Sequence, residues 1–480
     1  MHTPEIVFES ARSLAEQIRT RQRSSREVIS AHYDQIERVN PQVNAIVALL
    51  DREKALAAAD EADKAIAAGE ASGPLRGLPI AFKDVENAVG FPNTSGSPIY
   101  KDNFPTEDSV IVERIRRAGA IPIGKTNVPE FGLGSHSYNN VYGTTRNPYD
   151  LGRTAGGSSG GAAAALATGM LPIADGSDTG GSLRNPANFN NVVGFRISPG
   201  LVPQSPKPMP WLPIGVKGPL ARTVADCAWW LSVMAGYDPR DQMTWKSEPE
   251  QFAGSLESNP AGLRIAWAPD LGGLPVDRHV RHVIDDARPV FESLGCQVEE
   301  ACPDFTDAEE IFKTIRALNA TNLSPLVEKH RDLLKPEAIW NTEEGLKLSA
   351  EDVSRAMVKQ AALFERTRQF MQDYDAVVAV VNQVPPFPVE TTWPREVGGE
   401  QMESYIDWMR SAYFVTVTGL PAISVPAGFT PDGLPIGIQI VGRYRRELDL
   451  LKLAHAFEQA TLFGNRRPPV ALLNTEDSNG

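Results

Sequence analysis

The sequence predicts one large α/β domain whose β-sheet is covered by helices on both faces. Two observations predict this fold class. Short apolar runs alternate with helical stretches through most of the chain, as in strands that are connected by helices. In addition, no Pro-, Gly- or Ser-rich linker in the 480 residues is long enough to separate two domains.

Residues 1–70 are expected to form an N-terminal helical segment that packs on the core. Ser24, followed three residues later by Glu27, has the pattern of a capping box before an apolar helical face. Pro41 is expected to close this helix. A second helix, rich in alanine and charged residues, is predicted over 55–68. Neither helix carries obvious chemistry.

The other elements begin near residue 78, where apolar runs become short and Gly, Pro and Ser separate them. Strands are predicted at 78–82, 120–123, 171–174, 192–195, 263–267, 296–299, 376–381, 422–425 and 436–441. Helices are predicted at 109–118, 162–167, 280–294, most of 307–370, and 448–460.

The charge balance argues against nucleic acid and anionic membranes as partners. Lys and Arg number 47 and Asp and Glu number 60, which gives a formal net charge of −13 and a pI of about 5.2. The purely apolar runs are far shorter than the roughly 20 residues that span a bilayer. Three scattered cysteines and a start without a signal-peptide pattern predict a cytoplasmic protein. We expect neither a metal nor a cofactor, and a homodimer is compatible with the sequence.

Glycine and serine are most concentrated in two clusters, at 156–161 and 178–182. The first cluster opens a predicted helix, and the second follows a buried strand, so that backbone amides before Ser182 can bind an oxyanion. Neither cluster matches a Walker or dinucleotide-binding pattern, which disfavours nucleotide binding. A histidine-dependent serine hydrolase is also disfavoured, because only His136 lies near these clusters and the other histidines lie mostly in helical or terminal contexts.

A lysine is the alternative base. Lys83 directly follows the apolar run 78–82, so the strand is expected to carry its amine into the interior. Ser–Lys pairs are an established form of nucleophile and base. An ordinary lysine, with a pKa of about 10.4, is neutral in only about one molecule in 2,500 at pH 7. Burial can lower a lysine pKa by up to about 3–5 units, so the apolar strand is part of the predicted mechanism.

Seven motifs are spread over nearly the whole length of the chain. They are Gly-Leu-Pro-Ile-Ala-Phe-Lys-Asp at 77–84, Gly-Lys-Thr-Asn at 124–127, Gly-Gly-Ser-Ser-Gly-Gly at 156–161, Asp-Thr-Gly-Gly-Ser-Leu-Arg at 178–184, Gly-Pro-Leu-Ala-Arg-Thr at 218–223, Gly-Leu-Pro-Ala at 419–422 and Gly-Leu-Pro-Ile-Gly at 433–437. Through these motifs the chain resembles the amidase signature family. The resemblance implies a single α/β domain over 71–475 with a large mixed sheet. It also implies an amidase that cleaves C–N bonds of small-molecule amides through a Ser–cisSer–Lys triad.

The resemblance implies a role for each residue of the two clusters. Ser182 corresponds to the nucleophile, Ser158 to the bridging serine on a cis peptide bond, and Lys83 to the base. The amides of Thr179, Gly180 and Gly181, with that of Ser182, are expected to form the oxyanion hole. Asp178 and Arg184 are interpreted as supporting residues, and the sequence leaves open whether they form a buried salt bridge or contact substrate.

The substrate is less well defined than the reaction. The loop 205–213 is apolar and rich in proline, and it is either a pocket wall that includes Trp211 or a surface crossover. Gly132, beside Leu133, could leave room near the nucleophile. Insertions near 203–217 and 305–375 are expected to shape the pocket. These features favour hydrophobic aryl or alkyl amides.

Three other functions stay open at this point. One is the glutamine-amidase subunit of a tRNA-dependent amidotransferase, which resembles the same family and requires a second protein as partner. Another is a carbamate or ester hydrolase with the same triad. The last is a non-catalytic binding protein on this scaffold, which the presence of all three triad residues argues against.

Overall fold

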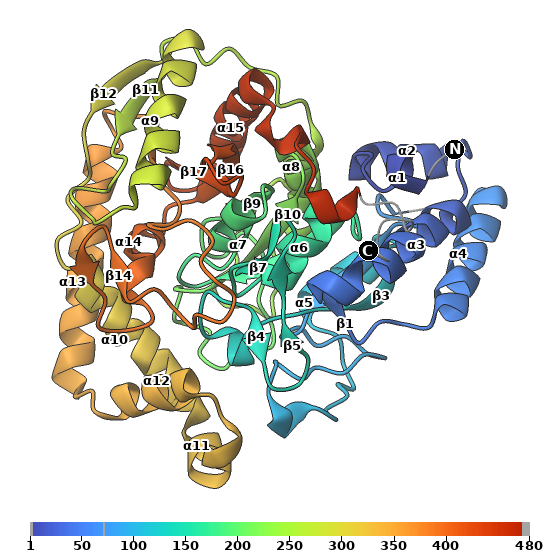
Figure 1. Cartoon of the computed structure of the whole chain (residues 1–480), viewed down its shortest axis with the longest axis horizontal. Helices are drawn as coiled ribbons and strands as arrows, with labels where there is room; N and C mark the ends of the chain where they lie inside the picture. The colour runs from blue at the N-terminus through green and yellow to red at the C-terminus, as the bar shows by residue number, and fades with distance from the viewer. Residues whose placement is uncertain (1–2, 71–72, 473–480) are drawn as a thin grey trace.

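The computed structural model describes residues 3–70 and 73–472, and an eight-stranded sheet lies at the centre of this structure (Figure 1). Its strand order is β12 (Gln297–Glu300), β11 (Arg264–Trp267), β13 (Ala376–Val380), β17 (Pro435–Gly442), β16 (Ala422–Phe429), β9 (Val193–Arg196), β10 (Val216–Ala221) and β8 (Ile173–Asp178). β11 pairs in parallel with β12 and β13, and every other pair is antiparallel. The large sheet is therefore mixed.

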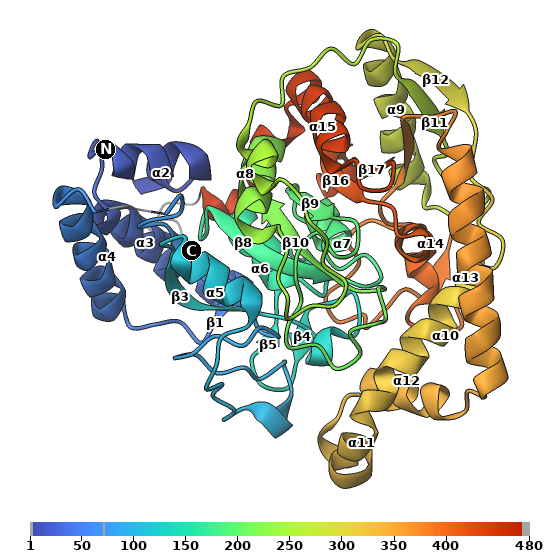
Figure 2. The same ribbon diagram turned by 180° about the vertical axis from the view of Figure 1, so that it is seen from behind.

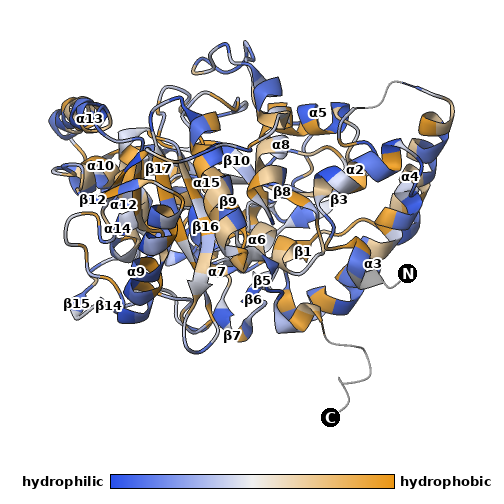
Figure 3. Ribbon diagram, turned by 90° about the horizontal axis from the view of Figure 1, so that it is seen from above, coloured by the Kyte–Doolittle hydropathy of each residue, from blue (hydrophilic) through white to orange (hydrophobic). Residues whose placement is uncertain are grey.

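Helices cover both faces of this sheet, as the alternation of apolar runs predicted (Figures 1 and 2). Side chains on one face of the strands pack with α8 (Val224–Met234), α9 (Arg278–Ser293) and α15 (Glu447–Thr461). The opposite face packs with α6 (Gly160–Ala167), α7 (Arg184–Phe189) and α14 (Arg410–Thr418). Figure 3 shows this layering from above, with hydrophobic residues on the strands between the helices.

A second sheet of three strands continues the large one. Its order is β1 (Ile46–Val47), β3 (Ile121–Thr126) and β2 (Pro79–Lys83), with β2 and β3 parallel. The backbone N–H of Lys83 donates to the carboxylate of Asp175 on β8, with a distance of 3.1 Å to Oδ1. A side chain thus joins β2 to β8, and this contact places Lys83 beside the large sheet.

The N-terminal helices are α1 (Thr3–Ile6), α2 (Ala11–Arg19), α3 (Ser25–Val43) and α4 (Arg52–Ala67). The capping box of Ser24 and Glu27 is confirmed at the start of α3. The prediction that Pro41 closes this helix is wrong, because α3 continues to Val43. Pro41 lies in the last turn, where it removes a single backbone N–H, and the helix ends at Asn44 in the left-handed conformation.

The remaining helices include α5 (Val110–Arg117) and a helical arm formed by α10 (Ala308–Ala320), α11 (Ser324–His330), α12 (Pro336–Leu346) and α13 (Ala350–Phe370). Short strand pairs are β4 (Tyr138–Asn139) with β5 (Gly143–Thr144), β6 (Arg146–Asn147) with β7 (Asp150–Thr154), and β14 (Glu396–Val397) with β15 (Glu400–Gln401). Over the part of the chain that the structure describes, every helix is too short or too polar to cross a membrane.

Candidate active site

Lys83 is the last residue of β2, and its side chain is buried like every residue of this strand. β2 lies between β3 and β8, so both of its edges are covered. The amine nitrogen Nζ lies 2.8 Å from Ser158 Oγ. It also lies 2.9 Å from Ser159 Oγ and 2.9 Å from Ser177 Oγ. Three hydroxyl groups therefore surround the amine, and none of them carries a charge.

This environment changes the protonation of Lys83. Burial is the main cause that lowers the pKa of Lys83 to about 7, and the positive charge of Lys217 acts in the same direction. The carboxylates of Asp175 and Asp178 oppose the shift. With this pKa, the neutral amine is readily accessible near neutral pH. A neutral amine can accept a proton, which is the requirement for a base.

Ser182 lies in the turn between β8 and α7. Gly181, directly before it, has a φ of +107°, a conformation that favours glycine. The Gly181 N–H donates a hydrogen bond to Asp178 Oδ1 at 2.9 Å. The sequence predicted this N–H as a donor of the oxyanion hole, but it already has an acceptor within the protein. Within the described residues, the N–H groups of Thr179, Gly180 and Ser182 donate to no other protein group. These three amides therefore have no acceptor among the described protein groups.

A buried ionic cluster holds this turn. The Asp178 carboxylate accepts hydrogen bonds from Arg184 at 3.0 Å to each oxygen, and Arg196 lies 3.3 Å from Oδ1. Burial alone would raise the pKa of Asp178, but the two guanidinium groups hold it well below its usual range. Arg184 also donates to the Ala412 carbonyl and to Thr416 Oγ1 on α14, at 3.0 Å each. Asp178 and Arg184 thus form a buried salt bridge, one of the two alternatives that the sequence left open.

A cavity of about 170 Å³ opens beside Ser182. Its apolar lining consists of Phe131, Leu133, Phe312, Ala320, Leu323 and Met409, together with Gly132, Gly134 and Gly180. Its polar lining consists of Ser135, Thr179, Ser182, Arg316, Asn319 and Asn322. The cavity lies where the β8–α7 turn meets α10 of the helical arm, so the structure brings Gly132 and Leu133 together with the predicted nucleophile.

Ser158 and Ser159 both lie near Lys83, but their surroundings differ. The peptide bond before Ser158 is cis. A Cβ atom added to Gly132, which lines the cavity, would lie 3.5 Å from Ser158 Oγ. A Cβ atom added to Gly176 on β8 would lie 2.8 Å from Ser159 Oγ. Ser158 is thus the serine on the cavity side of Lys83, and Ser159 points toward the sheet.

Comparisons with known proteins decide the family. The model of the Amidase family matches residues 27–451. The acylamidase of Rhodococcus erythropolis is 36% identical over 468 residues, which cover 97% of this chain and 98% of that protein. The chain belongs to the amidase signature family. The A subunit of the glutamyl-tRNA(Gln) amidotransferase of Carboxydothermus hydrogenoformans is 35% identical over 487 aligned positions, covering 97% of this chain and 99% of that one.

Solved structures agree with membership of the amidase signature family. A bacterial aryl acylamidase of this family superposes with a TM-score of 0.91 at 28% identity, covering 97% of this chain and 99% of that one. A 6-aminohexanoate cyclic dimer hydrolase superposes with a TM-score of 0.85 at 27% identity over 97% and 99% of the two chains. The amidase signature chain is therefore an amide hydrolase, and the alternative of a non-catalytic binding protein is set aside.

Trp211 and His136 both lie away from the cavity. Trp211 is 69% exposed and does not line the cavity, because its neighbours Leu212 and Ile214 turn inward and leave its ring outside. No residue of 203–217 is among the lining residues, whereas the insertion over 305–375 contributes α10 and the residues after it. His136 is a buried core residue whose ring nitrogens contact the Val389 carbonyl and Thr154 Oγ1, each at 2.8 Å.

Sequence reasoning missed two arginines of the amidase signature site. Arg196 ends β9 directly after a buried apolar run, which is the same signal that identified Lys83. Arg316 lies within the helix α10 and belongs to no motif. Its position on the helix brings it to the cavity. No sequence pattern that we considered marks it.

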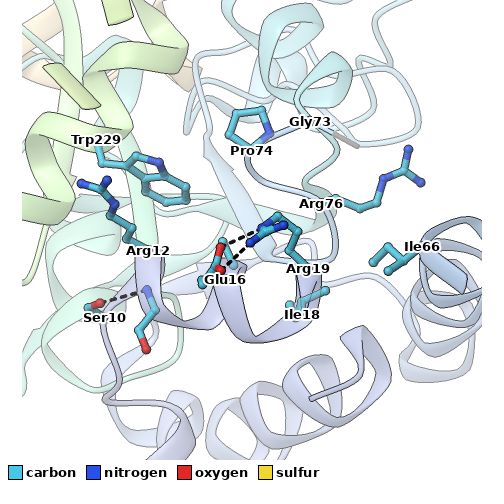
Figure 4. A pocket seen from close by; sticks show the side chains of 12 residues that line it. Ser10, Arg12, Glu16, Ile18, Arg19, Ile66, Gly73, Pro74, Arg76 and Trp229 are labelled. Carbon is cyan, nitrogen blue, oxygen red and sulfur yellow. Dashed lines mark hydrogen bonds and ion pairs between the residues drawn. The ribbon is translucent and has the colours of Figure 1, made fainter. Parts of the chain in front are cut away.

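Another cavity, of about 620 Å³, lies between α2, the residues before β2 and α8 (Figure 4). Arg12, Arg19 and Trp229 are among its lining residues, and none of the predicted site residues lines it. The charge of Arg19 is matched there by Glu16 at 2.6 Å. This cavity is larger than the one at Ser182, but the residues predicted for catalysis line only the smaller one or lie beside it.

Proposed function

We propose that this amidase signature enzyme hydrolyses small-molecule amides through an acyl-enzyme on Ser182. The observation that supports this most strongly is the 2.8 Å contact between Lys83 Nζ and Ser158 Oγ, directly behind the cavity that Ser182 lines. A neutral buried lysine, a bridging hydroxyl and a nucleophile at a cavity wall are the parts that an amide hydrolase without histidine requires.

The chemistry proceeds as a relay of one proton. Neutral Lys83 takes the proton of Ser158, which takes that of Ser182 while Ser182 Oγ attacks the carbonyl carbon. The amides of Thr179, Gly180 and Ser182 bind the oxyanion that forms. The proton returns through Ser158 to the leaving nitrogen, the C–N bond breaks, and the acyl group stays on Ser182. Water then attacks this ester by the same relay and releases the carboxylic acid.

The substrate class that fits the cavity is an amide with an apolar aryl or alkyl group. Phe131, Leu133, Phe312 and Met409 provide an apolar wall beside Ser182. The names of two similar proteins, an acylamidase and an aryl acylamidase, point in the same direction. An amide with such a group should be cleaved with a higher kcat/KM than acetamide, by about 1–3 kcal/mol per well-placed apolar group.

The second candidate is the glutamine-amidase subunit of an amidotransferase, because several similar proteins carry that name at 33–35% identity. Free glutamine carries both an ammonium and a carboxylate. Among the described residues, the cavity lining contains no aspartate or glutamate to bind the ammonium. A carbamate or ester hydrolase uses the same relay and differs only in the bond that it accepts.

A hydrolysis panel of anilides, primary amides, carbamates, esters and glutamine tests this proposal beside Ser182→Ala. Rapid quenching with a slow anilide should place the acyl group on the peptide that contains Ser182, as read by mass spectrometry. Acyl transfer to another residue would overturn the assignment of the nucleophile. Glutamine turnover equal to that of the best anilide would favour a role in an amidotransferase.

A further inference from the structure

We infer that Arg316 binds a carboxylate of the substrate, so that the enzyme prefers amides whose apolar part ends in an anionic group. This inference rests on the proposed function and specifies its substrate class. Arg316 lies on α10, is 8% exposed, and lines the same cavity of about 170 Å³ as Ser182. A positive charge therefore lies within the space that the substrate would occupy.

The partners of Arg316 are neutral. Its Nη1 donates to Asn341 Oδ1 and its Nη2 donates to the Tyr405 hydroxyl. The guanidinium also lies over the Tyr405 ring, 5.1 Å from the ring centroid. Within the described residues, no carboxylate lies within ion-pair distance of Arg316. The two hydrogen bonds use two of the five N–H groups of the side chain, and three remain.

Arg316 also borders a second cavity that Glu344, Glu403 and Asp407 line, but within the described residues none of these carboxylates lies within ion-pair distance of it. Glu337, one helical turn before Asn341, accepts a hydrogen bond from the Tyr138 hydroxyl at 3.0 Å. Its other carboxylate oxygen lies 4.0 Å from Lys335 Nζ. The charge of Glu337 is thus opposed by Lys335 and leaves Arg316 without a counter-ion.

A buried guanidinium without a counter-ion is uncommon, since charges are rarely buried unless they are paired. The other buried arginines of the site follow that rule, because Arg184 and Arg196 share Asp178. A carboxylate accepts hydrogen bonds from two parallel N–H groups of a guanidinium, so a bound carboxylate would satisfy N–H groups of Arg316 that have no acceptor. We therefore assign the missing anion to the substrate.

The rest of the cavity limits which anionic amides fit. Asn319 and Asn322 add neutral hydrogen-bonding groups near Arg316, while Phe131 and Leu133 are apolar. Since the lining holds no aspartate or glutamate among the described residues, an ammonium group would enter without a partner. The favoured substrate has a carboxylate and no amino group, as in a dicarboxylic acid monoamide or an amide of an aminobenzoate.

Two matched substrate pairs test this inference. For the acyl side, glutaramate is compared with the neutral pentanamide and with glutamine, which is glutaramate with an added amino group. For the amine side, N-butyryl-4-aminobenzoate is compared with butyranilide. Release of ammonia or arylamine gives kcat/KM for each. We expect the carboxylate substrate to be preferred in at least one pair, and glutaramate to be preferred over glutamine.

Arg316→Gln should lower kcat/KM for the preferred carboxylate substrate by about 10–100-fold, the range for hydrogen bonds to a charged group. Turnover of its neutral partner should fall less, because a neutral substrate forms no ion pair with Arg316, so the ratio of the two kcat/KM values reports the contact with the carboxylate. Arg316→Lys keeps the charge but loses the planar fork, so it should retain part of the preference. Arg355→Gln is the control, because Arg355 on α13 is exposed and pairs with Glu310 outside the cavity.

Binding provides a readout that does not depend on turnover. Titration of glutaramate and pentanamide into the Ser182→Ala protein should show the same loss of preference when Arg316→Gln is added. Absence of turnover with retained carboxylate preference in binding would contradict the proposed function and leave the inference standing. Equal effects of Arg316→Gln on charged and neutral partners, or no preference in either pair, would overturn the inference and give Arg316 a structural role.

Discussion

Lys83 differs from the nearby buried arginines in what surrounds it. Its amine meets three serine hydroxyls, while Arg184 and Arg196 meet a carboxylate. Hydroxyl groups can satisfy a neutral amine as well as an ammonium, whereas a carboxylate strongly favours the charged form of its partner. The neighbours of each buried cation therefore decide its protonation. Lys83 can exchange a proton, whereas Arg184 and Arg196 stay charged.

The first prediction concerns the pH dependence of the reaction. Burial lowers the pKa of Lys83 to about 7, so the neutral fraction rises as the pH rises through this value. We expect kcat/KM for a neutral amide to increase with pH through about 7 and then level off. A pH–rate profile of the free enzyme measures this, and a profile that falls over this range would contradict a lysine base.

The second prediction concerns Lys83→Arg, which keeps the charge but cannot be deprotonated. This change should reduce kcat by at least about 10²-fold, the lower end for loss of a general base. Lys101→Arg is the matched control, because Lys101 is exposed beside Asp102. Turnover of Lys83→Arg close to that of the unmodified enzyme would show that position 83 is electrostatic or structural.

The third prediction distinguishes the two serines beside Lys83. Ser158→Ala removes the hydroxyl on the cavity side and should reduce kcat by at least about 10²-fold. Ser159→Ala removes a hydroxyl that faces Gly176, so its effect should be smaller than about tenfold, as for one neutral hydrogen bond. Single-turnover acylation rates compare the two variants. A larger loss in Ser159→Ala would exchange their roles.

At the scale of single residues, the sequence predicted the site residues that belong to motifs. It missed the residues that reach the site only because distant segments pack together. Lys83 and Ser182 could be named because each ends or follows a buried strand within a recognisable motif. Arg316 could not, since only the crossing of α10 over the β8–α7 turn brings it to the cavity. Gly181 was placed among the oxyanion donors because a sequence does not show that Asp178 turns back to accept its N–H.

At the scale of elements, one carboxylate connects several of them. Asp178 ends β8, Arg184 begins α7, Arg196 ends β9, and Arg184 reaches the Thr416 hydroxyl on α14. The turn that carries Ser182 is therefore fixed by an ionic contact at the centre of the fold. Since this contact is fully buried, its loss should affect stability as well as activity.

The fourth prediction tests that contact by Asp178→Asn. This change leaves two buried guanidinium groups without a counter-ion and should lower the free energy of unfolding by about 3–5 kcal/mol. Because the guanidinium groups hold the pKa of Asp178 below its unfolded value, its contribution is present above that unfolded value and is lost as the pH falls toward the folded one.

Urea unfolding of Asp178→Asn at neutral pH measures this change. Glu365→Gln is the matched control, because Glu365 forms an exposed pair with Arg368 and its loss should change the free energy of unfolding far less. Equal stability of Asp178→Asn and Glu365→Gln would show that the cluster does not hold the turn.

The strands were predictable as elements, but their order was not. The apolar runs that follow residue 78 became strands, because runs of buried residues between turns fit a covered sheet. The sequence did not show that β2 and β3 form a separate sheet. In the structure, β2 is joined to β8 by a hydrogen bond to the Asp175 side chain and not by strand pairing. Composition alone left open whether Trp211 lies in a pocket wall or on the surface, and the inward turn of its neighbours leaves it on the surface.

At the scale of the whole molecule, the N-terminal helices are connected to the rest of the chain by buried polar contacts. The carboxylate of Asp226 on α8 accepts from the Ala11 N–H at 2.8 Å and from the Arg12 N–H at 3.1 Å. Arg222 donates to the Glu9 carbonyl at 2.6 Å. β1, which follows α3, pairs with β3 of the sheet that carries Lys83. The described part of this segment, residues 3–70, thus contributes directly to the frame of the site.

The last prediction tests this connection by Asp226→Asn. The amide side chain has nearly the same shape but only one accepting oxygen, so one N–H at the start of α2 stays buried without an acceptor. We expect the free energy of unfolding to fall by about 1–3 kcal/mol, the penalty for one unsatisfied buried donor. Because Asp226 touches neither Lys83 nor the cavity, kcat/KM for a neutral amide should remain within about twofold. Asp449→Asn, an exposed residue paired with Arg446, is the control for loss of a carboxylate. Unchanged stability in Asp226→Asn would mean that the apolar faces of α2 and α3 hold the N-terminal helices without this contact.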